Sequence, residues 1–288
     1  MNTLCRNISA FLEGKGFANS TKYIDGILII NTRTAEGHPR NILPISIFSH
    51  STKAAAQYSL VLQKCLGSFD KQLIIITEDR WNKQQKIMQA RLLAHLEYFT
   101  SIYARNCEIK RIDKATAREF LEVNHSYGDA ACKYRYGLYL KRHTGHCHAE
   151  RSEASLSPGT LVAVATFSNA RKWIKGDKTI RSYEWTRYAS LPGVRLSGGM
   201  GKVLKAFIKE VQPDDIMTYA DLEWSEGNVY EQLGFTLEGT KNPVTFVIDK
   251  HWMRHPIKTD ISIPEIPGAK YFQNFGSNKY RLKLTDYQ

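Results

Sequence analysis

The sequence predicts an α/β protein of the α+β type, with a mixed sheet that is flanked by helices and preceded by a smaller α/β unit. Short apolar runs, such as residues 73–76 and 161–167, alternate with segments of helical periodicity, such as residues 82–96. In addition, residues 217–235 pass from an apolar strand through a polar turn and a short helix into a Gly-Phe pair. Polar side chains therefore follow the carboxyl end of a strand, where open α/β sheets bind ligands.

The composition indicates a globular protein and the charge of its partner. The 288 residues are 42% hydrophobic and 24% charged, which is ordinary for a globular protein and sufficient for two modest domains. The net charge is +12 and the pI is near 9.4, so a polyanionic partner is favoured over an acidic protein surface. Nothing in the composition calls for an obligate protein partner.

The N-terminus and the cysteines indicate the compartment. No apolar run is long enough to cross a bilayer, so no membrane contact is expected, and no secretory signal follows Met1. The five cysteines are odd in number, scattered and free of any CxxC pair, which is typical of reduced thiols. We therefore expect a cytoplasmic protein.

Residues 1–105 are expected to form the first domain, because strand and helix patterns alternate along them. The expected strands are residues 23–30, 42–48 and 73–76, and the expected helices are residues 51–66 and 82–96.

Two motifs in this domain carry a family resemblance. They are Ile76-Thr-Glu78-Asp79-Arg-Trp81 and Ile102-Tyr-Ala-Arg-Asn-Cys-Glu-Ile-Lys110. Both resemble phage homing-endonuclease-like proteins, which implies that residues 20–105 derive from a nuclease domain related to very-short-patch-repair enzymes.

The sequence lacks the metal-binding residues that such nucleases carry. Such enzymes hold Mg²⁺ with an Asp and a nearby carboxylate-x-Lys pair, and the matching position here reads Asn31-Thr32-Arg33. The domain is thus expected to be catalytically dead, or only a structural or DNA-binding remnant, with no metal site. The paired acids Glu78 and Asp79 are better explained as acidic residues at a helix N-terminus.

The second domain is expected over residues 106–250, with the last part of the chain, residues 251–288, as an extended basic and aromatic tail. A helix that begins at Asp113 or Thr116 leads into a polar turn with His125. Two strands, residues 134–140 and 161–167, flank an inserted loop, residues 141–160. His146, Cys147 and His148 in that loop are a metal-site alternative, but a surface loop is the simpler explanation.

Residues 168–178 are basic, with an aromatic residue among the cations. Arg171, Lys172, Trp173 and Lys175 suit stacking on bases together with phosphate contacts, although a solvated loop explains them equally well. The next strand, residues 180–189, carries Glu184 near its centre.

A glycine-rich turn opens the helix expected over residues 203–211. Backbone N–H groups at such a turn point toward an anion, which makes this a candidate phosphate site. Its residues are Arg195, Gly198, Gly199, Gly201 and Lys202.

The most informative motif is Asn228-x-Tyr230-x-x-x-Gly234-Phe235, which follows Tyr219-Ala-Asp221. It resembles the last signature of the GNAT acyltransferase superfamily, and the longer string resembles the Mom-type branch, phage proteins that modify adenine in DNA. The resemblance covers roughly residues 110–250. It implies that Tyr230 lies near the thiol of acyl-coenzyme A and that Asn228 lies beside the cofactor.

The resemblance implies an acyltransferase that uses acetyl-CoA or another acyl-CoA, with nucleic acid, and DNA in particular, as the acceptor. Glu184 or Asp221 would serve as base, and Tyr230 would protonate the leaving thiolate. His125 would lie near the substrate, and a surface histidine at a capped helix end explains it equally well. The pyrophosphate would bind at Gly198–Gly201, although Leu196 stands where the family prefers Arg or Gln. The alternative is a non-catalytic nucleic-acid-binding protein derived from a mobile element. Asp221 has its own alternative role, as the cap of the following helix.

Overall fold

The computed structural model describes residues 2–67, 73–141, 156–225, 227–257 and 268–286. The chain divides into two compact units, each assembled from three separate stretches. Unit 1 comprises Met1–Tyr98, Ala220–Glu226 and Thr240–Asn278, and unit 2 comprises Phe99–Tyr219, Gly227–Gly239 and Lys279–Gln288. This division differs from the boundaries expected at residues 105 and 250, because two later stretches of the chain return to the first unit.

The main sheet of unit 1 has four strands in the order β1-β2-β3-β4. The first three strands run antiparallel, and β4 runs parallel to β3. The elements of this part of unit 1 are α1 (Thr3–Gly14), β1 (Asn19–Ile24), β2 (Ile27–Arg33), β3 (Pro39–Ile45), α2 (Thr52–Gly67), β4 (Leu73–Thr77), α3 (Glu78–Lys83) and α4 (Gln85–His95).

Both faces of this sheet are covered, which explains the unbroken isoleucine runs in its strands. Ile30 of β2 packs in one apolar cluster with α1 and α4, whereas its neighbour Ile29 packs in another cluster with α2. Successive strand residues point to opposite faces, so an apolar residue is needed at every position rather than at every second one. The second cluster also contains Ile248, Phe272 and Phe275, from the C-terminal part of the chain.

These C-terminal residues form a small three-stranded antiparallel sheet in unit 1, in the order β15-β14-β16. Its strands are β14 (Thr245–Ile248), β15 (Arg254–Pro256) and β16 (Lys270–Gln273). The Tyr271 N–H donates to the Ser49 carbonyl at 2.8 Å, which joins this sheet to the first part of the chain. Strands β15 and β16 lie within residues 251–288, where the sequence predicts an extended tail.

The strand expected over residues 23–30 is in fact a hairpin. Asp25 and Gly26, at the turn between β1 and β2, have φ angles of 49° and 77°. Two successive positive φ angles in a two-residue turn are typical of type I′, for which Asp-Gly is a preferred sequence. The Asp-Gly pair inside the apolar run was the signal for this turn.

The sheet of unit 2 has eight strands, in the order β13-β17-β12-β10-β8-β7-β6, with β9 paired to β10. Its strands are β6 (Cys107–Arg111), β7 (Tyr134–Leu140), β8 (Leu161–Phe167), β9 (Arg171–Lys175), β10 (Lys178–Ser190), β12 (Asp215–Asp221), β13 (Thr236–Lys241) and β17 (Ser277–Lys283). Strands β6, β7, β8 and β10 run antiparallel in succession, and β10 pairs with β12 in parallel. A separate parallel pair joins β5 (Thr100–Tyr103) to β11 (Val194–Ser197).

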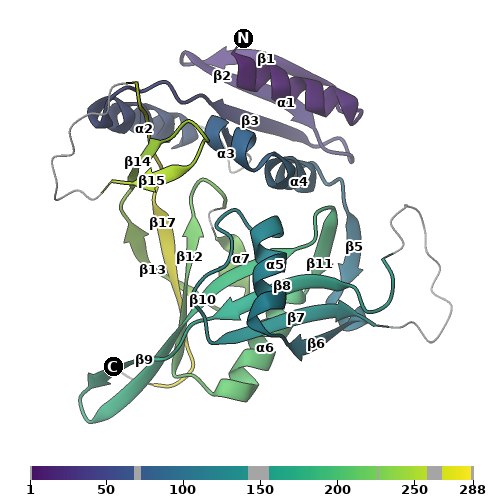
Figure 1. Cartoon of the computed structure of the whole chain (residues 1–288), viewed down its shortest axis with the longest axis vertical. Helices are drawn as coiled ribbons and strands as arrows, with labels where there is room; N and C mark the ends of the chain where they lie inside the picture. The colour runs from purple at the N-terminus through teal and green to yellow at the C-terminus, as the bar shows by residue number, and fades with distance from the viewer. Residues whose placement is uncertain (1, 68–72, 142–155, 226, 258–267, 287–288) are drawn as a thin grey trace. The chain divides into compact units, whose positions relative to one another are not determined.

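Helices lie on both faces of this sheet, which confirms the expected mixed α/β class (Figure 1). Helix α5 (Lys114–Asn124) packs on Val164 and Ala189, and Asp113 caps it by accepting from the Thr116 N–H at 2.8 Å. On the other face, Phe207 of α6 (Gly199–Val211) stacks on Phe167 at 3.9 Å between ring centroids. The remaining helical elements are η1 (Ala104–Asn106) and α7 (Asn228–Gln232).

Three further expectations can be compared with the described residues. The tail is not extended where it is described, because β17 lies between β12 and β13 in the sheet of unit 2. The basic stretch around Trp173 is strand β9, not a loop. The possible ligands His146, Cys147 and His148 lie outside the described residues, and the four described cysteines form no disulfide with one another. Within the described residues, no helix is both long and apolar enough to span a membrane.

Candidate functional site

The parallel strands β10 and β12 separate part-way along their length. They pair only from Ser182↔Asp215 to Glu184↔Met217, although β10 continues to Ser190 and β12 to Asp221. Ligands in open α/β sheets bind where neighbouring parallel strands part at their carboxyl ends. This opening is therefore the candidate site in unit 2.

A β-bulge marks the point at which the two strands part. The pairing of β10 with β8 shifts register between Trp185 and Arg187, which leaves Thr186 as the extra residue. The Thr218 hydroxyl donates to the Trp185 carbonyl at 3.1 Å. At this position a side-chain hydrogen bond therefore joins β12 to β10, just beyond the last main-chain pair, Glu184↔Met217. A bulge bends its strand locally and changes the direction of the side chains that follow.

Tyr230 lies beside this opening in an aromatic cluster. Its ring centroid is 6.2 Å from that of Trp185, 5.7 Å from that of Phe235 and 5.6 Å from that of Tyr280. Burial raises the pKa of the Tyr230 phenol, although a hydrogen bond to Thr218 acts in the opposite direction. The phenol therefore keeps its proton to a higher pH than an exposed tyrosine does.

Helix α6 begins with an open N-terminus on the same chain segment that leaves β10. Gly198 precedes the helix with a φ of 76°, and among the described residues no side chain caps this end and no acid lies in the first turn. The first N–H groups of a helix have no partner within it, and the helix dipole makes this end positive. Together these features suit an anion.

The other residues expected at this loop have different partners. The Lys202 ammonium donates to the carbonyl oxygens of Ala104 and Cys107, so it fastens α6 to the start of β6. The Arg195 guanidinium lies 5.3 Å from the centroid of the Phe99 ring. Gly199 is the residue that packing requires here, because a Cβ would lie 2.5 Å from the Tyr188 hydroxyl.

On the other side of β10, Arg187 binds the loop that follows α5. Its Nε donates to the Gly128 carbonyl at 3.0 Å, and its guanidinium lies 5.8 Å from the centroid of the Tyr127 ring. Burial lowers the pKa of Arg187, and the nearby carboxylates of Glu184 and Asp129 counteract that effect. Sequence patterns gave Arg187 no role in the site, because an Arg in an alternating strand is equally common on a solvated face.

His125 lies at the start of the same loop. Its Nδ1 accepts from the Tyr127 N–H at 3.1 Å, and the two rings are 6.3 Å apart. An imidazole that accepts at Nδ1 carries its proton on Nε2 when neutral. The contacts thus give His125 a part in shaping the turn.

Two further residues that the sequence placed in the site are Asp221 and Asn228. Asp221 belongs to unit 1, where its Oδ2 is 3.2 Å from the Arg80 Nη2 and its Oδ1 accepts from the Glu223 N–H at 2.9 Å. It caps the turn that follows β12, whereas Gly227 lies at the N-cap of α7, so Asp221 does not cap the following helix as the sequence allowed. Asn228, the first residue of α7, is exposed.

Unit 1 contains a buried cluster of opposite charges. Arg254 lies within ion-pair distance of both Asp79 and Glu223, whose side chains are 1% and 2% exposed. Arg80 pairs with Glu223 and Asp221, and Arg91 donates to the Glu223 carbonyl at 2.9 Å. Guanidinium groups therefore occupy the positions around these carboxylates that a metal ion would need.

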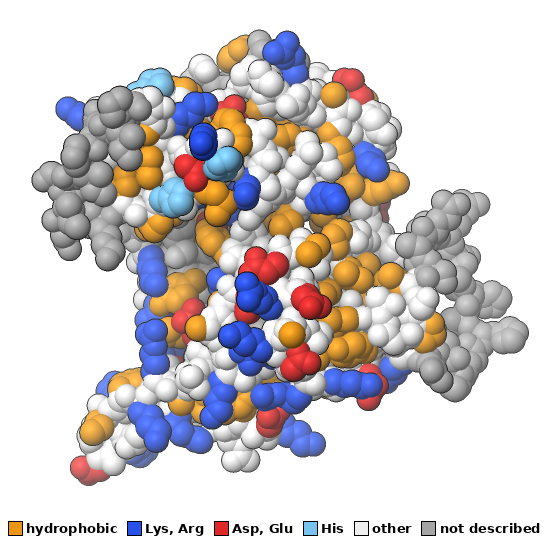
Figure 2. Space-filling model, in the orientation of Figure 1, with side chains coloured by type: hydrophobic (Ala, Val, Ile, Leu, Met, Phe, Trp, Pro, Cys, Tyr) orange, Lys and Arg blue, Asp and Glu red, His pale blue; other side chains and the backbone are white. Residues whose placement is uncertain are grey.

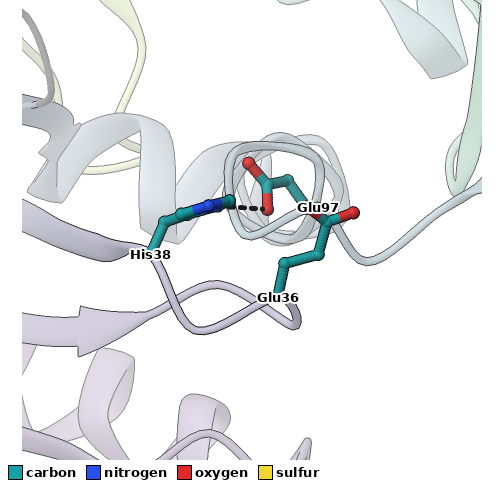
Figure 3. Close-up of side chains that lie close together, drawn as sticks. All are labelled: Glu36, His38 and Glu97. Atoms are coloured by element: carbon teal, nitrogen blue, oxygen red, sulfur yellow. Dashed lines mark hydrogen bonds and ion pairs between the residues drawn. The ribbon is translucent and has the colours of Figure 1, made fainter.

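A second group of acidic and histidine side chains lies at the surface of unit 1 (Figure 3). One ligand atom from each of Glu36, His38 and Glu97 lies within 4.8 Å of the others. The His38 Nδ1 is 3.3 Å from the Glu97 Oε2, and the Arg40 Nη2 is 3.1 Å from the Glu97 Oε1. Arg40 already supplies a positive charge to this carboxylate, so the group is a surface ion-pair cluster.

The basic residues expected to contact nucleic acid line the hairpin of β9 and β10. Arg171, Lys172 and Lys175 are exposed, as is Ile174, and Trp173 is 36% exposed. In the space-filling view, cationic side chains gather over this hairpin and along the neighbouring edge (Figure 2).

Comparisons with known proteins add little to this geometry. No family model and no curated protein matches the chain. One solved structure, described as histone acetyltransferase HPA2 and related acetyltransferase from Corynebacterium glutamicum, overlaps 84% of this chain and 98% of its own. Its sequence identity is 13% and the TM-score is 0.31. A TM-score of this size is too low to support an argument about fold or function.

Proposed function

We propose that unit 2 is a GNAT-type acyltransferase domain. The feature that carries the proposal is the opening between β10 and β12, which begins at a bulge and is followed in the chain, after the short strand β11, by the open N-terminus of α6. The strand order, with four antiparallel strands leading into one parallel pair, supports the same fold. The motif around Tyr230 lies beside the opening, as that superfamily would require.

The residues present fit an acyl-coenzyme A. Phosphate groups would bind the N–H groups of Gly199, Met200 and Gly201, because this helix end offers donors and carries no competing acid in its first turn. When bound, the cofactor would supply an acyl group as a thioester.

The side chains around the opening would act as the proton donor and the proton acceptor of the reaction. Tyr230 would donate a proton to the departing sulfur, because its raised pKa keeps the phenol protonated. Glu184 is better placed than Asp221 to accept a proton from the acceptor, since Asp221 is ion-paired with Arg80. Arg187 would position Glu184 and hold the Gly128 loop against β10.

We further propose nucleic acid, and DNA in particular, as the acceptor, in the manner of the Mom-type branch. The exposed β9–β10 hairpin supports this, because it combines cations for phosphate contact with the Trp173 ring for stacking. A protein that uses these features for binding alone, without acyl transfer, is the second candidate.

For unit 1 we propose a degenerate nuclease-like domain. The order α1-β1-β2-β3-α2-β4, with β3 and β4 parallel, supports a nuclease-type core, and neither β2 nor β3 carries a carboxylate-x-Lys pair. The buried acids nearest its centre are neutralised by Arg80 and Arg254.

The decisive experiment measures melting temperature with and without acetyl-CoA, because a ligand that binds only the folded state raises the midpoint. Met200→Glu places a carboxylate in the first turn of α6, where it would repel phosphate without disturbing the helix. Met200→Gln is the matched neutral control. We expect a shift in the wild type and in the Gln variant, and none in the Glu variant.

A different result would favour the second candidate function, nucleic-acid binding without acyl transfer. If acetyl-CoA and free coenzyme A leave the midpoint unchanged while DNA binds in a salt-sensitive way, unit 2 is a binding module.

A further inference from the structure

Strand β9 and the first part of β10 form a two-stranded ribbon at one end of the sheet of unit 2 (Figure 1). Over residues 178–181, β10 pairs with β9 and with no other described strand, because its pairing with β12 starts at Ser182 and its pairing with β8 starts at Trp185. All five residues of β9 are exposed. The ribbon is therefore free to contact another molecule.

The register of the two strands assigns each side chain of the ribbon to one face. Residues that pair directly across the ladder share a face, and successive residues alternate between faces. Trp173 pairs with Ile180, which is 2% exposed, so their face is partly packed. Ile174 pairs with Thr179 on the other face, and both are exposed. Ile174 is 79% exposed, more than any other large apolar side chain in the described part of the chain.

Like charges oppose each other across the ladder on both sides of the Ile174–Thr179 pair. Lys172 pairs with Arg181, and Lys175 pairs with Lys178. Such pairs destabilise a ladder. The Arg181 Nε is 3.6 Å from the Asp214 Oδ2, whereas the three lysines form no ion pair with a described residue. The ribbon thus carries positive charge that a polyanion would neutralise.

A ribbon of two strands matches the major groove of B-form DNA. This groove is about 12 Å wide and about 8.5 Å deep and admits such a ribbon, whereas the major groove of an RNA duplex is too narrow for side chains to read. Phosphates follow both edges of the groove, where cations along a ribbon can reach them. Apolar side chains inside the groove contact the 5-methyl group of thymine.

We propose that the β9–β10 ribbon enters the major groove of double-stranded DNA with its Ile174 face toward the bases, and that Ile174 contacts a thymine methyl group. Lys172 and Lys175 contact phosphates at the edges of the groove. This inference rests on the proposed nucleic-acid acceptor, and it adds the form of the nucleic acid, the groove and the favoured base. Stacking on the Trp173 ring, which requires unpaired bases, is the competing mode of binding.

The test compares DNA duplexes of one mixed sequence that contain either thymine or uracil. Uracil lacks only the 5-methyl group, which lies in the major groove. The full-length protein is titrated with each labelled duplex by fluorescence anisotropy at one salt concentration. We expect the thymine duplex to bind about fourfold more tightly for each methyl group that the ribbon buries. A DNA single strand and an RNA duplex of the same sequence should bind more weakly than the thymine duplex.

One substitution separates the methyl contact from the attraction of phosphates. Ile174→Ser removes the apolar contact at a position that is open to solvent, so the fold should be unchanged. This variant should bind the thymine duplex more weakly, bind the uracil duplex as the wild type does, and so lose the preference. Leu237→Ser makes the same change on exposed strand β13 and is the matched control, which should keep the preference.

Equal binding of the thymine and uracil duplexes by the wild type would overturn the proposal, and so would a preference that persists in Ile174→Ser. Tighter binding of the single strand than of the duplex would replace groove entry with stacking on Trp173. A thymine preference without an acetyl-CoA midpoint shift would keep the ribbon proposal and refute acyl transfer. A midpoint shift without a thymine preference would do the reverse.

Discussion

The Arg254 guanidinium lies 2.5 Å from the Asp79 Oδ2 and 2.7 Å from the Glu223 Oε1, and so neutralises two buried carboxylates at once. Its partners are 175 and 31 positions away in the sequence. Burial alone would raise the pKa of Asp79, but Arg254 holds that pKa below its ordinary value. The three stretches of unit 1 therefore meet at one cation.

Removal of this cation should destabilise unit 1 strongly. Arg254→Gln would leave Asp79 and Glu223 buried without full compensation, which costs about 3–5 kcal/mol. Urea unfolding followed by circular dichroism measures the loss. Arg171→Gln, on the exposed hairpin, is the control and should change the free energy of unfolding by less than about 0.5 kcal/mol.

Removal of one charge of each sign tests the explanation. The double variant Asp79→Asn with Arg254→Met leaves Glu223 paired with Arg80, so it should recover much of the stability lost by Arg254→Gln. A double variant as unstable as the single one would mean that shape, not charge, holds this cluster.

Glu238 should give unit 2 a measurable acid sensitivity. Hydrogen bonds from Arg281 and Lys279 outweigh burial and lower its pKa from 4.5 to about 2. A carboxylate with a lowered pKa contributes stability above its unfolded value and loses it as the pH falls through the folded value. The stability difference between the wild type and Glu238→Gln should thus be constant above about pH 5 and shrink between about pH 4.5 and 2. A difference that does not vary with pH would contradict this assignment.

Substitution by alanine should change the protein's stability in opposite directions at the two glycines near the start of α6. At Gly199 a Cβ would lie 2.5 Å from the Tyr188 hydroxyl and 2.8 Å from Leu196, so Gly199→Ala should cost about 1–3 kcal/mol. At Gly201 the nearest atom, on Leu233, would be 3.4 Å away, so the better helix propensity of alanine should stabilise by up to about 1 kcal/mol. Thermal unfolding of both variants checks the contrast, and Tyr188→Phe should relieve part of the Gly199→Ala defect.

Tyr230→Phe should separate catalysis from cofactor binding. Loss of the proton donor should lower kcat roughly 100-fold while the acetyl-CoA midpoint shift persists. Because the pKa of Tyr230 is raised, kcat of the wild type should not fall between about pH 7 and 9 through loss of this proton. Tyr23→Phe, on exposed strand β1, is the control. Equal activity of the two variants would exclude Tyr230 as the donor.

The β9–β10 hairpin should account for part of the salt dependence of DNA binding. Replacement of Lys172, Lys175 and Lys178 by Gln should reduce the slope of log K against log salt by roughly 0.9 for each phosphate that is no longer neutralised. Lys205→Gln with Lys209→Gln, on the exposed face of α6, is the control pair. Fluorescence anisotropy over a salt series measures both slopes, and equal slopes would place the DNA elsewhere.

Local patterns in the sequence predicted much of the fold. The helix after Asp113 and the isoleucine-rich strands required only periodicity and a capping residue, and the structure contains both. Strand β17 was missed although Tyr280 and Leu282 alternate with polar residues, because a preceding run of prolines suggested an extended tail. The hairpin at Asp25-Gly26 was missed because the apolar residues on both sides resemble one strand.

The candidate site was only partly predictable, and for a different reason. Tyr230 and the glycines of α6 belong to short motifs, which a sequence displays directly. Arg187 matters because of what surrounds it after folding, and no spacing along the chain encodes that. Arg254 is the extreme case, since its partners are set by the return of the chain to unit 1.

The return of the later stretches of the chain to unit 1 affects folding during synthesis. The apolar cluster beneath β2 and β3 includes Phe272 and Phe275, so unit 1 lacks part of its core until residue 275 has left the ribosome. Translation proceeds from the N-terminus, so the first 98 residues must wait for partners that are synthesised much later. A nascent chain stalled before residue 240 should therefore bind chaperones, and expression of an N-terminal fragment alone should yield aggregate rather than a folded domain.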